Sequence, residues 1–288
     1  FKQADYVERQ SGLCELALHN FPLLGLGHIR IHNRDGVSYL QEMLPVDCLF
    51  LDPARRDGHG GKTVAISDCE PDVTVLEPLL VDKAKKVMVK LSPMLDLSLA
   101  LNELKTVRAV HIVAVNNECK ELLLILQKES VSSEVSIHCE HIAGNGESRH
   151  YTFTLKQEKT SPCLLADEVG TYLYEPNAAI LKAGAFRSLT QTYPVAKLHL
   201  NSHLYTSVSL VPDFPGRRFR VEAVSGFGKK ELKAFLMDMD KANITIRNFP
   251  LSVAELRKRL KLKEGGDDYI FATTLSGGQK VLIRGKKC

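Results

Sequence analysis

The chain has 288 residues, of which 44% are hydrophobic and 25% charged, and its formal net charge is +4. This composition, with a mean hydropathy of −0.10, is typical of a soluble globular protein of two or three domains. No run of about 20 apolar residues occurs, and the first residues lack the apolar segment of a signal peptide, so we expect a cytoplasmic protein without membrane segments.

Short strand patterns alternate with helical patterns over residues 1–157, which is typical of an α/β domain built on a parallel sheet. Strands are predicted at residues 5–8, 28–32, 46–51, 87–91 and 109–115. Helices are predicted at residues 11–18, 37–44, 73–81, 95–104 and 118–127. Two adjacent strands follow, at 135–142 and 150–155, and Ala143-Gly144-Asn145-Gly146 predicts the hairpin turn between them.

The alternation stops in residues 158–214, where we predict a small α+β module. A helix is predicted at 175–190, followed by strands at 196–200 and 207–211. Pro212-Asp213-Phe214-Pro215-Gly216 then predicts a domain boundary.

A second α+β pattern covers residues 215–288. Strands are predicted at 219–224, 244–246, 269–275 and 280–283. Helices are predicted at 229–239 and 253–260. Ser252 and Glu255 have the spacing of a capping box at the start of the second helix.

Charge is distributed unevenly along the chain. Residues 215–288 hold 17 Lys and Arg against 8 Asp and Glu, whereas residues 1–214 hold 21 against 26. This asymmetry favours a polyanion-binding domain attached to a mildly acidic body, although a basic solvated surface without a partner remains an alternative. Seven cysteines without a CxxC pair indicate reduced thiols, and we expect neither a metal site nor a disulfide framework.

Three acidic residues, Glu8, Asp35 and Asp52, follow three successive predicted strands. Acids at the carboxyl ends of neighbouring strands line one crevice in a doubly wound sheet. The first could accept hydrogen bonds from both hydroxyls of a ribose, the second could receive an adenine amino group, and the third could face a reacting centre. Each acid alone could instead be a capping residue at a strand end.

The segments around these acids resemble three motifs of class I S-adenosylmethionine-dependent methyltransferases: Tyr6-Val7-Glu8-Arg9, Asn33-Arg34-Asp35 and Asp52-Pro53-Ala54-Arg55-Arg56-Asp57. Four further segments narrow the resemblance to a bacterial methyltransferase family with a C-terminal THUMP-like domain: His59–Lys62, Asp68–Asp72, Lys90–Met94 and Val115–Leu122. The resemblance covers most of the chain. It implies a Rossmann-like methyltransferase domain at 1–157, a ferredoxin-like α+β module at 158–214 and a basic THUMP-like domain at 215–288.

By this resemblance Glu8, Asp35 and Asp52 would hold S-adenosylmethionine, and Asp52, Pro53, Ala54 and Arg55 would form the methyl-transfer edge. The family's glycine-rich loop and first strand have no counterpart before Glu8. We therefore expect the isolated 1–288 chain to bind the cofactor poorly and to be inactive.

The resemblance implies methyl transfer to RNA, either rRNA or tRNA. Arg55 stands where methyltransferases acting on amino groups carry an aromatic residue, so a guanidinium would have to stack on the base. A uracil C5 reaction would need a cysteine nucleophile, and Cys119, before a predicted helix, could have a lowered pKa. Buried, inert cysteines are more common.

Candidate RNA-binding residues lie in the basic C-terminal domain: Arg217, Arg218, Lys229, Lys230, Arg257, Lys258 and Arg259. Basic clusters with few aromatics favour contacts to the RNA backbone. Two alternatives stay open, namely a non-catalytic RNA-binding protein with a vestigial methyltransferase fold and a methyltransferase acting on a small molecule or protein.

Overall fold

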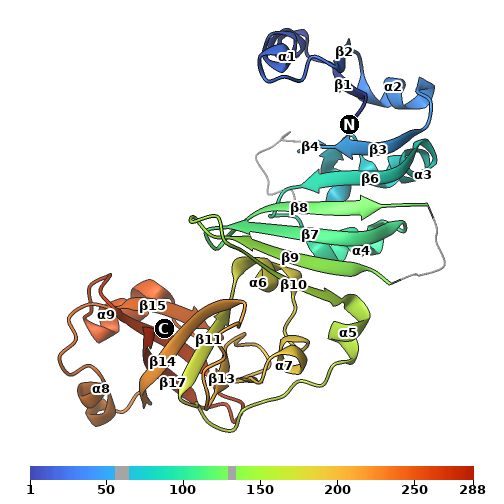
Figure 1. Ribbon diagram of the computed structural model, residues 1–288. Helices are drawn as coiled ribbons and strands as arrows, with labels where there is room; N and C mark the ends of the chain where they lie inside the picture. The colour runs from blue at the N-terminus through green and yellow to red at the C-terminus, as the bar shows by residue number, and fades with distance from the viewer. Residues whose placement is uncertain (56–64, 129–133) are drawn as a thin grey trace. The chain divides into compact units, whose positions relative to one another are not determined.

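The computed structural model describes residues 1–55, 65–128 and 134–288 (Figure 1). The chain divides into two compact units. The first unit comprises Phe1–Val110 and Leu122–Ser133, and the second comprises His111–Glu121 and Glu134–Cys288.

The first unit begins with a βαβ motif. Strand β1 (Ala4–Glu8) pairs in parallel with β2 (Ile29–Asn33), and α1 (Ser11–Leu23) connects them. The crossover helix is needed because parallel strands cannot be joined by a tight turn. Cys14 and Ala17, three residues apart in α1, lie on its buried side. Helix α2 (Gly36–Glu42) follows β2 directly.

A six-stranded sheet has the strand order β10-β9-β7-β8-β6-β3. Its strands are β3 (Val46–Leu51), β6 (Ala84–Leu91), β7 (Val107–Val115), β8 (Glu118–Leu126), β9 (Ser136–Ile142) and β10 (Ser148–Thr154). β3 and β6 are parallel, whereas β8 runs antiparallel to β6. Helices α3 (Val73–Lys83) and α4 (Leu97–Glu103) precede and follow β6. This is a mixed α/β sheet rather than the all-parallel sheet that the alternating pattern suggested.

The helix predicted at 118–127 is wrong, because these residues form β8. Asn116 and Asn117, with φ of 51° and 63°, make a two-residue turn between β7 and β8. Two left-handed residues are the requirement of a type I′ hairpin turn. The periodicity of a short apolar run does not distinguish a buried strand from a buried helix. The turn at Asn116 and Asn117 is the feature that indicates a strand here.

The second unit contains a seven-stranded sheet of order β12-β13-β11-β14-β17-β16-β15 (Figure 1). The strands are β11 (Tyr172–Pro176), β12 (Ala196–Lys197), β13 (Tyr205–Ser207), β14 (Gly216–Ser225), β15 (Asn243–Arg247), β16 (Asp268–Thr274) and β17 (Lys280–Lys287). Because β11 pairs with β14, the two parts of the chain on either side of residue 215 share one sheet.

The helices of this unit are short: α5 (Leu155–Thr160), α6 (Ala178–Ala183), α7 (Leu189–Thr192), α8 (Lys229–Phe235) and α9 (Val253–Leu260). The single helix predicted at 175–190 is therefore wrong. Its first residues belong to β11, and Gly184, with φ of 75°, ends α6. Glycine adopts this left-handed conformation at little cost and commonly ends a helix.

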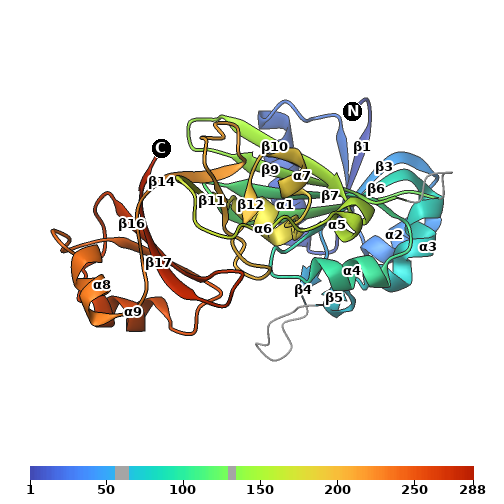
Figure 2. The same cartoon turned by 90° about the horizontal axis from the view of Figure 1, so that it is seen from below.

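Two apolar cores cover the two faces of the seven-stranded sheet. Ile270 and Ala272 belong to the core beneath α8 and α9, whereas Phe271, between them in β16, belongs to the other core. Alternate residues of a strand point to opposite faces. Figure 2 shows α8 and α9 together on one side of this sheet.

Candidate functional site

Glu8 is the last residue of β1 and lies opposite Asn33 of β2. The Asn33 side-chain amide donates to the carbonyl oxygens of Glu8 (3.0 Å) and Arg9 (3.1 Å). One Glu8 carboxylate oxygen accepts from the backbone N–H of Gln10 at 2.7 Å. In the part of the chain that the structure describes, no hydrogen bond to the other oxygen is found. Glu8 therefore presents an oriented acceptor at the carboxyl end of the strand.

Asp35 follows β2 and is the N-cap residue of α2. Its Oδ1 accepts from the backbone N–H of Ser38 (2.8 Å) and from the Ser38 hydroxyl (2.9 Å). The backbone hydrogen bond from Ser38 contributes most to lowering the pKa of Asp35, because it stabilises the charged carboxylate. Asp35 thus has the capping role that the sequence left open as an alternative.

Asp52 follows β3, and Oδ2 of its half-exposed carboxylate lies 2.6 Å from Nζ of Lys90. Lys90 comes from β6, the parallel neighbour of β3, so both residues lie near the carboxyl ends of their strands. Pro53 is buried. The lysine fixes the carboxylate and partly neutralises it.

The segment after Pro53 is also held in place. Strand β4 (Ala54–Arg55) pairs antiparallel with β5 (Cys69–Glu70), with Ala54 opposite Glu70. Arg9, next to Glu8, donates to Glu70 at 3.1 Å. This contact connects the residue after β1 with β5, the strand that pairs with Ala54 and Arg55. Arg56, Asp57, His59 and Lys62 lie outside the described residues.

The prediction of a lowered pKa for Cys119 is wrong. Cys119 lies in β8, and no helix begins after it. Burial raises the pKa of its thiol and outweighs the charge of Lys182, which lowers it, while Glu121 adds a smaller contribution that raises it. The protonated thiol is a poor nucleophile, so this cysteine fits a structural role.

The predicted RNA-binding residues fall into two groups. Lys229, Lys230 and Lys258 are exposed, and among the described residues no carboxylate pairs with them. The guanidinium of Arg259, also exposed, lies 5.2 Å from the centre of the Phe227 ring. These four cations are available to a polyanion.

Each of the other three cations uses part of its guanidinium in a contact within the protein. Arg218 donates to the carbonyl oxygen of Pro212, and Arg257 donates to that of Ala242 at 3.1 Å. Arg217 is bound to Glu175 through Nε, at 2.8 Å, and through Nη2.

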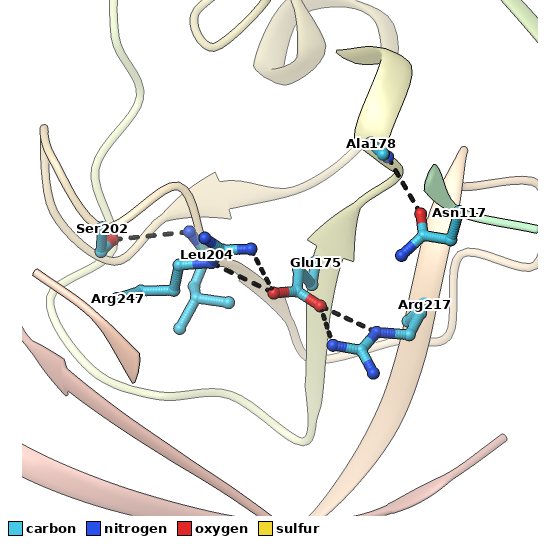
Figure 3. Close-up of polar contacts among 7 residues, drawn as sticks. All are labelled: Asn117, Glu175, Ala178, Ser202, Leu204, Arg217 and Arg247. Atoms are coloured by element: carbon cyan, nitrogen blue, oxygen red, sulfur yellow. Dashed lines mark hydrogen bonds and ion pairs between the residues drawn. The ribbon is translucent and has the colours of Figure 1, made fainter. Parts of the chain in front are cut away.

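Glu175 is the centre of an ion-pair network that crosses the seven-stranded sheet (Figure 3). Its side chain is only 3% exposed, and its second oxygen accepts from Nε (3.1 Å) and Nη2 (2.8 Å) of Arg247. One buried carboxylate therefore holds two arginines, from β14 and β15, and the group keeps a net positive charge. Sequence analysis missed Glu175 and Arg247, which are 72 residues apart.

A groove of about 570 Å³ lies beside this network. It is lined by Arg217, Asn243, Ile244, Thr245, Val253, Ala254, Arg257, Glu264 and Tyr269. Two of the predicted RNA-binding residues, Arg217 and Arg257, are thus brought together although they are distant in sequence.

Two features are absent among the residues that the structure describes. No helix is both long and apolar enough to cross a membrane. Nor does any cluster of three or more His, Cys, Asp or Glu side chains have an arrangement that could hold a metal ion.

Residues 172–215 match the family described as a ferredoxin-like domain, and residues 216–287 match the family described as THUMP domain-like. No curated protein matches the chain in sequence. A solved structure from Porphyromonas gingivalis W83, described as a "putative methyltransferase", is similar over the whole chain, with 36% identity and a TM-score of 0.89. The match covers 72% of that protein. The chain therefore belongs to the family of methyltransferases that carry a C-terminal THUMP-like domain.

Proposed function

We propose that this protein transfers a methyl group from S-adenosylmethionine to RNA, either rRNA or tRNA. The observation that carries the proposal is the position of Glu8, Asp35 and Asp52, each directly at or after the carboxyl end of a strand, in a member of a methyltransferase family. Ligands of open α/β sheets bind at this edge.

The acceptors at this edge suit the adenosine half of the cofactor. The Glu8 carboxylate would accept hydrogen bonds from the ribose hydroxyls, and Asp35 would lie at the adenine edge. Asp35 Oδ1 is used by Ser38, which leaves Oδ2 for a ligand. When bound, S-adenosylmethionine supplies a methyl group activated by its sulfonium.

Asp52 and the backbone of Pro53 and Ala54 would orient the acceptor base. Lys90 holds the Asp52 carboxylate, and the pairing of Ala54 with Glu70 fixes the following backbone. Catalysis at such a site consists of holding the acceptor in line with the methyl group, and orientation of this kind lowers the barrier substantially.

The THUMP-like domain would bind the RNA through its exposed cations. Lys229, Lys230, Lys258 and Arg259 project from α8 and α9. Contacts of lysine and arginine with phosphates supply most of the sequence-independent affinity of a protein for nucleic acid.

Mass-spectrometric mapping of RNA modifications in cells with and without the gene tests the proposal. One methylated nucleotide should disappear from rRNA or tRNA on deletion and return with the wild-type gene. It should not return with Asp52→Ala, whereas Asp47→Ala, which changes an exposed acid at the other end of β3, should restore it. An unchanged RNA methylation pattern, with RNA binding retained, would leave a non-catalytic RNA-binding protein as the better account.

A further inference from the structure

The groove of the THUMP-like domain is built from one edge of the sheet and one helix. One side is formed by three residues of β15, namely Asn243, Ile244 and Thr245. The other side is formed by three residues of α9, namely Val253, Ala254 and Arg257. β15 is the last strand in the sheet order, so within the described parts of the chain its outer edge is not paired with another strand. The groove thus lies at an edge of the sheet and contains charged side chains.

Arg217 enters this groove as a fixed cation. Glu175 binds its Nε and Nη2, and the same carboxylate binds Arg247. One carboxylate does not neutralise two guanidinium groups, so the region keeps positive charge. The remaining nitrogen, Nη1, has no hydrogen-bond acceptor among the described residues.

Arg257 is fixed in a similar way from the opposite side. Its Nη1 donates to the carbonyl oxygen of Ala242 at 3.1 Å, which leaves Nε and Nη2 for a ligand. An arginine that is already held in place loses less conformational entropy when it binds a phosphate. Arg257 thus offers two nitrogens and Arg217 one, and two such cations in one groove suit a chain of phosphates.

The other groups in the groove favour a nucleotide over an acidic peptide. Tyr269, whose ring lies 4.9 Å from that of Phe219, offers a rigid aromatic surface. Glu264 and the side-chain oxygen of Asn243 are acceptors, and a nucleotide has hydroxyl and amino groups that can donate to them. A peptide rich in carboxylates has neither a base to lie against Tyr269 nor ribose hydroxyls to donate to these acceptors.

We propose that this groove binds an unpaired RNA segment, with Arg217 and Arg257 on its phosphates and Tyr269 against a base or ribose. The inference rests on the proposed function and specifies which surface holds the RNA and in which form. The volume of about 570 Å³ falls in the range of sites for small ligands. A volume of this size suits a nucleotide or two of a single strand and is too small to enclose a duplex.

Fluorescence anisotropy of the chain with a labelled 12-nucleotide RNA, single-stranded or annealed to its complement, tests this inference. The single strand should bind at least tenfold more tightly than the duplex. Arg257→Gln should weaken binding of the single strand at least tenfold. Arg220→Gln removes the same charge from an exposed arginine of the same domain, outside the groove, and should change binding less than twofold.

A second pair of variants tests the same inference if Arg257→Gln does not fold. Ala254→Glu places a carboxylate in the groove, and Gln279→Glu places one in the exposed turn between β16 and β17, outside the groove. The first should weaken binding at least tenfold and the second less than threefold.

Three outcomes would overturn the groove assignment alone. The first is an equal loss of RNA affinity for the two variants within each pair, and the second is equal affinity for single strand and duplex. The third is displacement of the RNA by an acidic peptide at equal concentration. No binding of the wild-type chain to either RNA would overturn the RNA partner of the proposed function as well.

Discussion

Glu175 shows how a single buried carboxylate can organise two strands. It accepts from Arg217 and from Arg247, which come from β14 and β15. Because either arginine alone still compensates the carboxylate, replacing one should be much less costly than replacing both. Removal of every partner leaves a charge buried without compensation.

We expect Arg217→Met and Arg247→Met each to lower the free energy of unfolding by about 1 kcal/mol, and the double variant to lower it by about 3–5 kcal/mol. Urea unfolding of the three variants measures this. Adding Glu175→Gln to the double variant should recover part of the stability. The account would be contradicted if the double variant lost only the sum of the two single losses in free energy of unfolding. It would also be contradicted if Glu175→Gln recovered none of the lost stability.

His203 is a second residue with a defined pH response. It stacks on Phe186, with ring centres 3.6 Å apart, and burial lowers its pKa from 6.5 to about 4, with the charges of Lys197 and Arg247 adding to the effect. A histidine whose pKa is lowered in the folded state stabilises the protein fully above pH 6.5. This stabilisation is lost as the pH falls from 6.5 towards 4, because only the unfolded chain takes up the proton.

The wild-type free energy of unfolding should therefore decrease between pH 7 and pH 4.5, with up to about 3 kcal/mol coming from His203. His203→Asn should weaken this dependence, since asparagine does not titrate and tolerates the left-handed φ of 54°. It should not abolish it, because burial also lowers the pKa of His141. Unfolding curves at several pH values that coincide for both proteins would refute the assignment.

Among single residues, the sequence indicated positions at strand ends better than it indicated contacts between side chains. Glu8, Asp35 and Asp52 could be selected because strand ends can be read from local patterns. The partners of Asp52 and Glu175 could not, since Lys90 lies on another strand and Arg217 lies 42 residues from Glu175. Pairing between strands is a tertiary property that local patterns do not contain.

Among the helices and strands, α9 is one whose start can be predicted from a few neighbouring residues. The predicted capping box is present: Ser252 Oγ accepts from Glu255 N at 3.2 Å, and Glu255 accepts from Ser252 N at 2.7 Å. Both bonds lie within one turn, so four residues of sequence contain the information. β8 is the opposite case, because its apolar run is compatible with helix and strand alike.

Ser252→Ala should lower the free energy of unfolding by about 1 kcal/mol, because the first N–H groups of α9 lose their acceptor. Ser252→Asn should restore most of it, since asparagine is an equally good N-cap residue. Chemical denaturation, followed through the unfolding transition of the second unit, measures the stability of both variants. Equal stability of the alanine variant and the wild type would show that the cap contributes nothing here.

For the whole molecule, the charge asymmetry of the sequence corresponds to a distinct part of the structure. The basic residues 215–288 contain the exposed cations of α8 and α9 and the groove with Arg217 and Arg257. The sequence predicted a basic domain but not the groove, which forms only when β14, β15 and α9 come together.

RNA binding by the chain should weaken steeply with salt, as expected when phosphate contacts release counterions. Replacing both Lys229 and Lys230 by glutamine should reduce the slope of log K against log salt concentration by up to about 1.4, because each contact to a single strand contributes about 0.7. Binding isotherms between low and physiological salt give the slope. A slope unchanged by the double variant would exclude α8 from the RNA interface.

The central claim is that the protein methylates RNA, and in vitro methyl transfer tests it most directly. The product of the complete gene is incubated with labelled S-adenosylmethionine and with RNA from cells that lack the gene or from parent cells. The account predicts that label enters a single nucleotide of rRNA or tRNA from the deletion cells, while RNA from the parent cells, already methylated, takes up little. The account would be contradicted if neither RNA took up label, or if the label entered protein or small molecules instead.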